Sequence, residues 1–192
     1  VYSISTAICI PLLGYLSEKF GRKNIYLIGI AGFSIFSALS GLSQNLDQIL
    51  IFRLLQGVFS APLVALSQSI IVNAFPEKER GKALSFWTLG LLIGPLIGPL
   101  LGGYFAEHYS WRWVFLINVP IGIIAFIGSY ICLEENKINK KIKFAFLSFI
   151  FLALGASSMQ LVLDRGQILD WFSSNFIINL TISAVIFLFL FF

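Results

Sequence analysis

The chain alternates between long apolar stretches and short polar loops. Seven stretches are dominated by apolar residues, and the interior ones approach the length of about 20 residues with which a helix crosses a bilayer. They cover residues 1–16, 25–43, 48–74, 84–106, 113–133, 144–163 and 176–192. A transmembrane β-strand needs only about 10 residues, so the pattern predicts helices. We therefore expect an all-α transmembrane protein whose first and last spans are truncated.

Basic residues are concentrated in alternate loops. One set of loops holds every lysine of the chain, together with Arg22 and Arg80. These lysines are Lys19, Lys23, Lys78, Lys82, Lys137, Lys140, Lys141 and Lys143. The opposite loops hold only Arg112 and Arg165, but they are rich in aromatic residues. Because positively charged loops remain in the cytoplasm, the lysine-rich side is predicted to be cytoplasmic and the aromatic side to lie at the outer interface.

The fourth apolar stretch combines a regular glycine repeat with two prolines. Its glycines and prolines are Gly90, Gly94, Pro95, Gly98, Pro99, Gly102 and Gly103. Glycines at every fourth position form one groove without side chains on a helix, and such a groove lets a neighbouring helix approach closely in lipid. Each proline removes a backbone donor, which bends a membrane helix rather than breaking it. We expect a closely packed, bent transmembrane helix here.

The composition supports a membrane protein and excludes several other classes. Of the 192 residues, 58% are hydrophobic and 11% are charged, whereas a soluble domain is about a quarter charged. The net charge of +4 does not predict a nucleic-acid partner, because the basic residues lie in short loops between apolar spans. Cys9 and Cys132 lie inside apolar stretches and predict neither a disulfide nor a metal site. With no nucleophile triad or phosphate loop, we expect neither an enzyme nor a cofactor.

The first cytoplasmic loop carries glycines, one acid and three bases in a fixed order. Its residues are Gly14, Glu18, Lys19, Gly21, Arg22 and Lys23. On composition alone this is either a basic loop that sets the topology or a place where lipid head groups or partner carboxylates bind. The order resembles the signature loop between the second and third helices of the major facilitator superfamily, with Glu18 where the family usually has Asp. The resemblance implies a conformational latch between two helical domains.

A second motif places a charge inside the third span. Arg53 lies about two turns inside the outer end, where an arginine costs at least about 2.5 kcal/mol unless it is paired or hydrated. It can snorkel to the outer head groups, or it can face an interior cavity and shift the pKa of a nearby carboxylate. We favour the cavity, because Gln56, Gly57, Ser60 and Ser67 continue a polar stripe on the same face.

Arg53, Gln56 and Gly57 also resemble the fourth-helix motif of the superfamily, which is implicated in proton coupling. The resemblance implies that the acidic partner of Arg53 comes from a first helix that this chain does not contain. The glycine–proline order of residues 90–103 resembles the fifth-helix motif of the antiporters in this superfamily.

Two further stretches narrow the branch of the family. Trp111-Arg112-Trp113-Val114-Phe115-Leu116-Ile117-Asn118-Val119-Pro120-Ile121-Gly122 opens the fifth span, and Asp164-Arg165-Gly166 with Asp170-Trp171-Phe172 fills the last outer loop. On their own they read as an interfacial anchor and an ionic loop. Together with the other motifs they resemble the drug:proton antiporter branch with fourteen spans.

The resemblance implies the organisation of the chain as part of a superfamily helical bundle. Residues 1–133 correspond to part of the N-terminal transporter domain, from its second to its sixth span. Residues 134–143 correspond to a cytoplasmic linker, and residues 144–192 to an extra helical hairpin between the two halves. The chain is thus expected to be a piece of a longer protein and to be inactive by itself.

The implied function is proton-coupled multidrug efflux, a drug:H⁺ antiport across the inner (plasma) membrane. The implied partners are hydrophobic or amphipathic drugs, protons and the lipid bilayer, with a periplasmic adaptor and an outer-membrane channel continuing the path out of the cell. Two alternatives stay open. One is an exporter of a specific metabolite from the same branch, and the other is a structural or regulatory membrane subunit that transports nothing.

Overall fold

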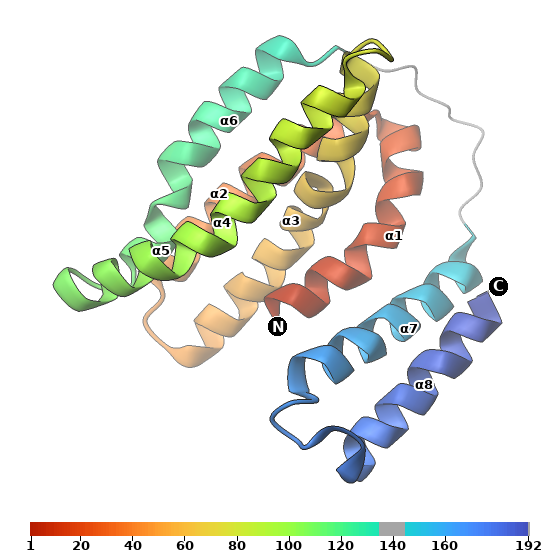
Figure 1. Ribbon diagram of the computed structural model, residues 1–192. Coiled ribbons are helices and arrows are strands. Elements are labelled where there is room, and N and C mark those ends of the chain that lie inside the picture. The colour runs from red at the N-terminus through yellow and green to blue at the C-terminus, as the bar shows by residue number, and fades with distance from the viewer. Residues whose placement is uncertain (135–144, 192) are drawn as a thin grey trace.

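The computed structural model describes residues 1–134 and 145–191, and these residues form helices joined by short connections (Figure 1). The helices are α1 (Tyr2–Phe20), α2 (Arg22–Leu42), α3 (Leu46–Ala74), α4 (Arg80–His108), α5 (Trp113–Leu116), α6 (Asn118–Cys132), α7 (Phe146–Arg165) and α8 (Asn175–Phe191), with a short 3₁₀ helix η1 (Trp171–Ser173) before α8. No strand occurs within these two ranges.

Every apolar stretch of the sequence is helical with bounds close to the expected ones, although the stretch 113–133 is divided into α5 and α6. Five segments are long and apolar enough to cross a membrane. They are Arg22–Leu42, Leu46–Ala74, Arg80–His108, Trp113–Cys132 and Phe146–Arg165. Helix α8 is a shorter apolar helix of 17 residues. The prediction of an all-α transmembrane fold is confirmed. The expected linker at 134–143 lies outside the described residues, apart from Glu134.

Helix α3 lies at the centre of the packing. It packs against α1 and α2, while α2 also packs against α6, and α7 packs against both α8 and α1. Figure 1 shows α6 and the α7–α8 hairpin on opposite sides of the bundle. The hairpin is therefore attached to the rest of the molecule through α1.

Glycines allow α2 and α3 to approach each other closely. A Cβ atom added to Gly29 would lie 2.9 Å from the Cβ of Pro62, and one added to Gly32 would collide with the ring of Phe59. The Phe59 ring stacks on Phe36, with 5.4 Å between the ring centroids. Because lipid tails are as apolar as leucine, helices in a membrane associate through such close contacts rather than through the hydrophobic effect.

Local sequence signals explain where several helices begin and end. Gly21 separates α1 from α2 with a φ of 87°, a left-handed conformation that glycine adopts without strain. Asn45 caps α3, because its Oδ1 accepts a hydrogen bond of 2.9 Å from the backbone N–H of Gln48. Pro120 lies in the first turn of α6, where a proline is tolerated because the first N–H groups of a helix have no partner within it.

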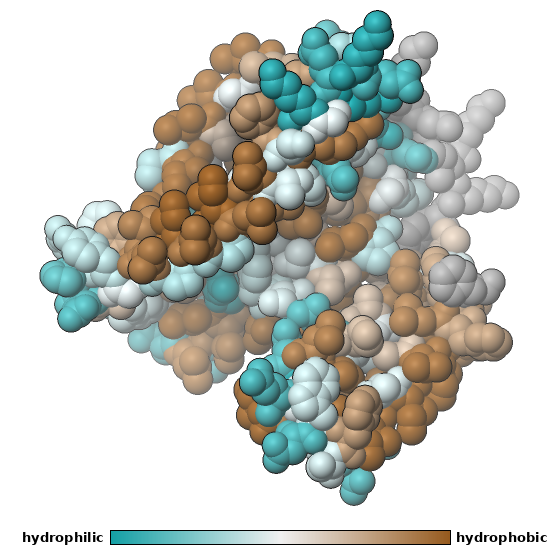
Figure 2. Space-filling model, viewed as in Figure 1, coloured by the Kyte–Doolittle hydropathy of each residue, from teal (hydrophilic) through white to brown (hydrophobic). Residues whose placement is uncertain are grey.

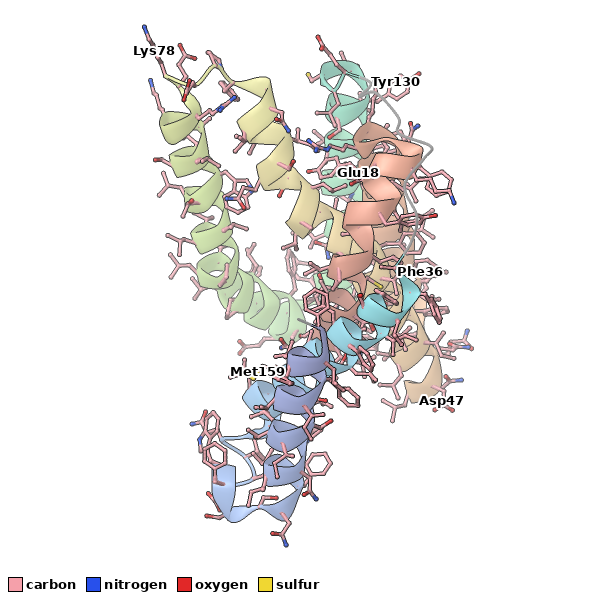
Figure 3. The ribbon with its side chains drawn as sticks, turned by 90° about the vertical axis from the view of Figure 1, so that its right-hand side faces the viewer. Glu18, Phe36, Asp47, Lys78, Tyr130 and Met159 are labelled. Atoms are coloured by element: carbon pink, nitrogen blue, oxygen red, sulfur yellow. The ribbon has the colours of Figure 1, made fainter. Side chains whose placement is uncertain are left out.

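The helices alternate in direction, as the distribution of basic loops predicts. Figure 3 shows Glu18, Lys78 and Tyr130 at one end of the bundle and Asp47 at the other. The connections α1–α2 and α3–α4 and the end of α6 thus share one side, which carries the lysines of the described residues. By the positive-inside rule we expect this side to be the cytoplasmic one. The lysines at 137, 140, 141 and 143 lie outside the described residues.

Helix α4 differs from the expectation of close packing. It contains no buried residue, and Figure 2 shows a band of hydrophobic side chains along it. An added Cβ at Gly90, Gly94 or Gly98 would meet no atom within 4 Å, and one at Gly102 would only touch a Val114 methyl at 4.0 Å. The helix runs unbroken through both prolines. Within the described ranges, no neighbouring helix fills the glycine groove at Gly90, Gly94 or Gly98.

Candidate functional site

The guanidinium of Arg53 lies between three helices. Arg53 is seven residues after the start of α3, which at about 1.5 Å per residue is about 10 Å along the helix. Its Nη1 donates a hydrogen bond of 2.9 Å to Oε1 of Gln56, one turn further along. Its Cζ lies 4.5 Å from the ring centroid of Tyr2 on α1 and 5.4 Å from that of Phe115 on α5.

These contacts favour the interior orientation of Arg53 over snorkelling to the head groups. The side chain is half-buried, and Gln56 beside it is only 1% exposed, so the accepting amide oxygen has a fixed position. No carboxylate among residues 1–134 and 145–191 forms an ion pair with Arg53, whose contacts are the amide and the two rings. Its acidic partner thus stays a prediction.

The polar surface continues along the interface between α1 and α3. The hydroxyl of Thr6 lies 2.8 Å from Oγ of Ser60 and 3.1 Å from the carbonyl oxygen of Gly57. At Gly57 an added Cβ would lie 2.5 Å from the carbonyl oxygen of Tyr2, so only glycine lets the two backbones approach this closely. Arg53, Gln56, Gly57 and Ser60 therefore share one interface.

Ser67 belongs to a different interface. Its Oγ accepts a hydrogen bond of 3.2 Å from the indole Nε1 of Trp87 on α4. The expected polar stripe along α3 is therefore divided, with its outer part facing α1 and its inner end facing α4. Pro62 lies inside α3, between Ser60 and Ser67.

The residues of the latch-like loop are distributed around one tight turn. Glu18 is exposed and forms neither a hydrogen bond nor an ion pair with any described residue. Nζ of Lys19 donates a hydrogen bond of 2.7 Å to the hydroxyl of Tyr15 on the same helix. Gly14 is exposed, and a Cβ there would meet nothing within 4 Å. A latch through Glu18 therefore needs a partner from outside the described residues and stays a prediction.

The two bases after the turn contact other helices. Nη1 of Arg22 donates a hydrogen bond of 3.2 Å to Oγ of Ser69 on α3, and Nζ of Lys23 lies 5.3 Å from the ring centroid of Tyr130 on α6. Both side chains line a cavity of about 290 Å³ together with Asn73. The loop thus connects the lysine-bearing ends of α2, α3 and α6.

The aromatic stretch at the start of the fifth span is tied to α2 by polar groups. Oγ of Ser37 donates a hydrogen bond of 2.8 Å to the carbonyl oxygen of Phe115, and Nδ2 of Asn118 donates one of 3.1 Å to Oγ of Ser37. Nη2 of Arg112 donates one of 3.3 Å to the carbonyl oxygen of Ser43. These bonds fix α5 and the start of α6 against the outer half of α2.

Sequence reasoning did not identify Tyr2, Thr6 and Phe115 as residues of this site. Tyr2 and Phe115 are 51 and 62 residues from Arg53, and the chain holds 20 phenylalanines, so neither spacing nor composition singles them out. The one feature of the sequence that could have identified any of them is that Thr6 is a polar residue inside an apolar span.

Comparison with known proteins agrees with the family that the sequence resembles. The family model of the Major Facilitator Superfamily matches residues 1–192. The chain is 38% identical over 186 residues to "Probable multidrug resistance protein EmrY" and 37% identical over 187 residues to "Multidrug export protein EmrB", both of Escherichia coli K12. It is 35% identical over 186 residues to "Fatty acid resistance protein FarB" of Neisseria gonorrhoeae.

Each of these alignments covers 96% of this chain and 36% or 37% of the relative. The chain therefore spans about a third of the length of the curated relatives that it matches. The family match extends over the whole chain, and five helices are long and apolar enough to cross a membrane. This multi-pass membrane chain belongs to the major facilitator superfamily.

Proposed function

We propose that the complete gene product is a proton-coupled exporter of hydrophobic or amphipathic drugs, and that it is a carrier rather than an enzyme. The observation that carries this proposal is Arg53, which is half-buried between α1, α3 and α5. A charge held inside a membrane bundle marks an ion or solute pathway, because burial of such a charge is otherwise unfavourable. The names of the relatives EmrY and EmrB support drugs as the substrates.

In the proposed mechanism two helical halves alternate around a central cavity, and an inward-moving proton resets the carrier. Arg53, Gln56 and Gly57 are proposed to serve the proton-coupling step. The basic loop at the α1–α2 turn is proposed to latch the halves, and α4 to close the cavity. The protein would lie in the inner (plasma) membrane, with a periplasmic adaptor (EmrA-like) and an outer-membrane channel (TolC-like) as partners.

A second candidate is the export of a specific amphipathic metabolite. The relative FarB is named for fatty acid resistance, which favours amphipathic carboxylates as alternative substrates. An accumulation assay with both a cationic dye and a long-chain fatty acid distinguishes the two candidates. Export of the fatty acid alone would favour the metabolite exporter.

The test of the proposal is Arg53→Ala in the complete gene product. We expect this change to abolish proton-driven drug efflux while the protein still inserts into the membrane, because Gln56 and the two rings would lose the charge that they surround. Efflux is measured as dye accumulation in cells with and without an imposed proton gradient.

Arg165→Ala is the matched control, because Arg165 is exposed at the end of α7 and its loss should leave efflux unchanged. Equal accumulation in cells with and without the protein would contradict the transporter proposal and favour a structural or regulatory subunit. Normal efflux by the Arg53→Ala variant would show that Arg53 is not required for proton coupling.

A further inference from the structure

We propose that Tyr2 and Phe115 form an aromatic clamp around the Arg53 guanidinium, and that Phe115 is a positioning residue for the proton-coupled step. The inference rests on the proposed function and deepens it, because it states how the coupling charge is kept at its depth. Nothing in the spacing of the motifs brings these two aromatic residues together.

The geometry of the clamp is that of two cation–π contacts from two different helices. The Arg53 Cζ lies 4.5 Å from the Tyr2 ring centroid and 5.4 Å from the Phe115 ring centroid. Both distances are within the limit of about 6 Å at which a guanidinium is attracted to a ring face, and the attraction grows when water is excluded. Tyr2 is on α1 and Phe115 is on α5, so the charge is held from two helices.

The Phe115 ring is placed by backbone contacts that do not depend on its own side chain. Ser37 donates a hydrogen bond of 2.8 Å to the Phe115 carbonyl oxygen, and Asn118 holds the Ser37 hydroxyl at 3.1 Å. The ring of Trp111 meets Phe115 edge-on, with 6.1 Å between the centroids. Hydrogen bonds to α2 thus fix the position of the Phe115 ring, and the ring in turn restricts the position of the Arg53 guanidinium.

Aromatic faces hold the cation without occupying its N–H donors. A guanidinium has five N–H groups, and Gln56 accepts from one of its nitrogens. A carboxylate in the same place would take two donors and neutralise the charge. The clamp therefore keeps Arg53 positioned while it leaves donors and a full positive charge for an acid that gains and loses a proton.

A purely structural role for Phe115 predicts a different outcome from the clamp. Packing requires an apolar side chain, which leucine supplies at a somewhat smaller volume, whereas the clamp requires an aromatic face. Phe115→Leu and Phe115→Tyr in the complete gene product therefore separate the two roles. Phe126→Leu is the matched control, because Phe126 is an aromatic residue of α6 that stacks on Tyr130 rather than on Arg53.

The first measurement does not depend on transport. Purified protein is treated with phenylglyoxal, and modification of Arg53 is followed by peptide mass spectrometry. We expect Phe115→Leu to raise the modification rate of Arg53 about two- to fivefold, as loss of one ring contact allows. Phe115→Tyr and Phe126→Leu should match the wild type. An unchanged rate in Phe115→Leu would overturn the clamp.

The second measurement is transport in proteoliposomes. We expect Phe115→Leu to lower the maximal rate of proton-driven transport and to leave the apparent KM for the drug unchanged, with recovery in Phe115→Tyr. A changed modification rate with an unchanged maximal rate would overturn the positioning role. If wild-type protein moves no drug, the proposed function fails, and the modification rate still decides whether the clamp exists.

Fluorinated phenylalanine at position 115 keeps the test valid if Phe115→Leu does not fold. Fluorine atoms preserve the shape of the ring but withdraw the electron density that attracts a cation. Each added fluorine should raise the modification rate of Arg53 further. A rate that does not depend on fluorination would show that only packing is involved and would overturn the clamp.

Discussion

Individual glycines of this chain differ sharply in their surroundings. Gly57 lies where α1 crosses α3, and an added Cβ would meet the Tyr2 carbonyl oxygen at 2.5 Å and the Ser5 Cβ at 2.8 Å. Gly98 lies on the open face of α4, where an added Cβ would meet nothing within 4 Å. Glycine thus lets two helices approach closely at position 57, whereas at position 98 no neighbouring helix lies against it among the described residues.

Gly57→Ala is expected to destabilise the folded chain, and Gly98→Ala is not. The added methyl at position 57 would press on a backbone carbonyl that cannot move without shifting α1, which costs about 1–3 kcal/mol in a packed interior. Thermal unfolding of both variants in detergent gives the comparison. Equal midpoints for Gly57→Ala and the wild type would mean that α1 and α3 are further apart than described.

Sequence analysis predicted part of the site at this scale. The pairing of Arg53 with Gln56 follows from their separation of three residues on one helix, which brings their side chains together. The same reasoning placed Ser67 in the stripe, although its hydrogen bond goes to α4. Tyr2 and Phe115 could not be predicted, because contacts between distant helices depend on how the helices cross.

At the scale of elements, three interhelical hydrogen bonds tie the fifth span to α2. Ser37 is fully buried and joins the Phe115 carbonyl oxygen to the Asn118 amide. In a bilayer such interhelical bonds are specific ties, because lipid offers no polar substitute. Gly122 fits against Ser34 on the same side of α2, where a Cβ would collide with the Ser34 hydroxyl.

Ser37→Ala should loosen this tie more than Ser40→Ala does. The first change removes the two hydrogen bonds that join α2 to the fifth span, which costs about 1–2 kcal/mol, although the Phe115 carbonyl keeps the Ile117 N–H and the Asn118 amide keeps the Val114 carbonyl. The second removes a hydroxyl, equally buried, that bonds only the Phe36 carbonyl of its own helix. Unfolding in denaturant measures both. A larger loss for Ser40→Ala would contradict the interhelical role of Ser37.

The elements themselves were predictable because apolar length and basic loops report directly on membrane spans. The packing of α4 was not. Its glycine repeat predicts a close neighbour, and the described residues provide none along Gly90, Gly94 and Gly98. A glycine repeat shows which face of a helix can pack closely against a neighbour, but it does not identify the neighbouring helix.

At the scale of the whole molecule, the positions of the lysines predict which end of the bundle faces the cytoplasm. Figure 3 places Lys78 and Asp47 at opposite ends of the bundle, and both side chains are exposed. The domain boundaries at residues 133 and 144 are what the family resemblance implies and stay a prediction. The α7–α8 hairpin contacts the remaining described helices through α1. That contact, unlike the helices, has no signature in the sequence.

Single cysteines should report this orientation. In a background with Cys9→Ser and Cys132→Ser, we expect Asp47→Cys to react with a membrane-impermeant maleimide added to spheroplasts. Lys78→Cys should react only after the membrane is permeabilised, because the positive-inside rule predicts that its loop is cytoplasmic. The reverse pattern would invert the topology and place the basic turn outside the cell.

The single-residue turn at Gly21 has a mechanical consequence. With only one residue between them, α1 and α2 have no slack, so a tilt of one must displace the start of the other. Because α1 touches the hairpin and α2 touches α6, a push on the hairpin would be passed across the molecule to its far side. Lengthening this turn by a few flexible residues would let the two helices move independently.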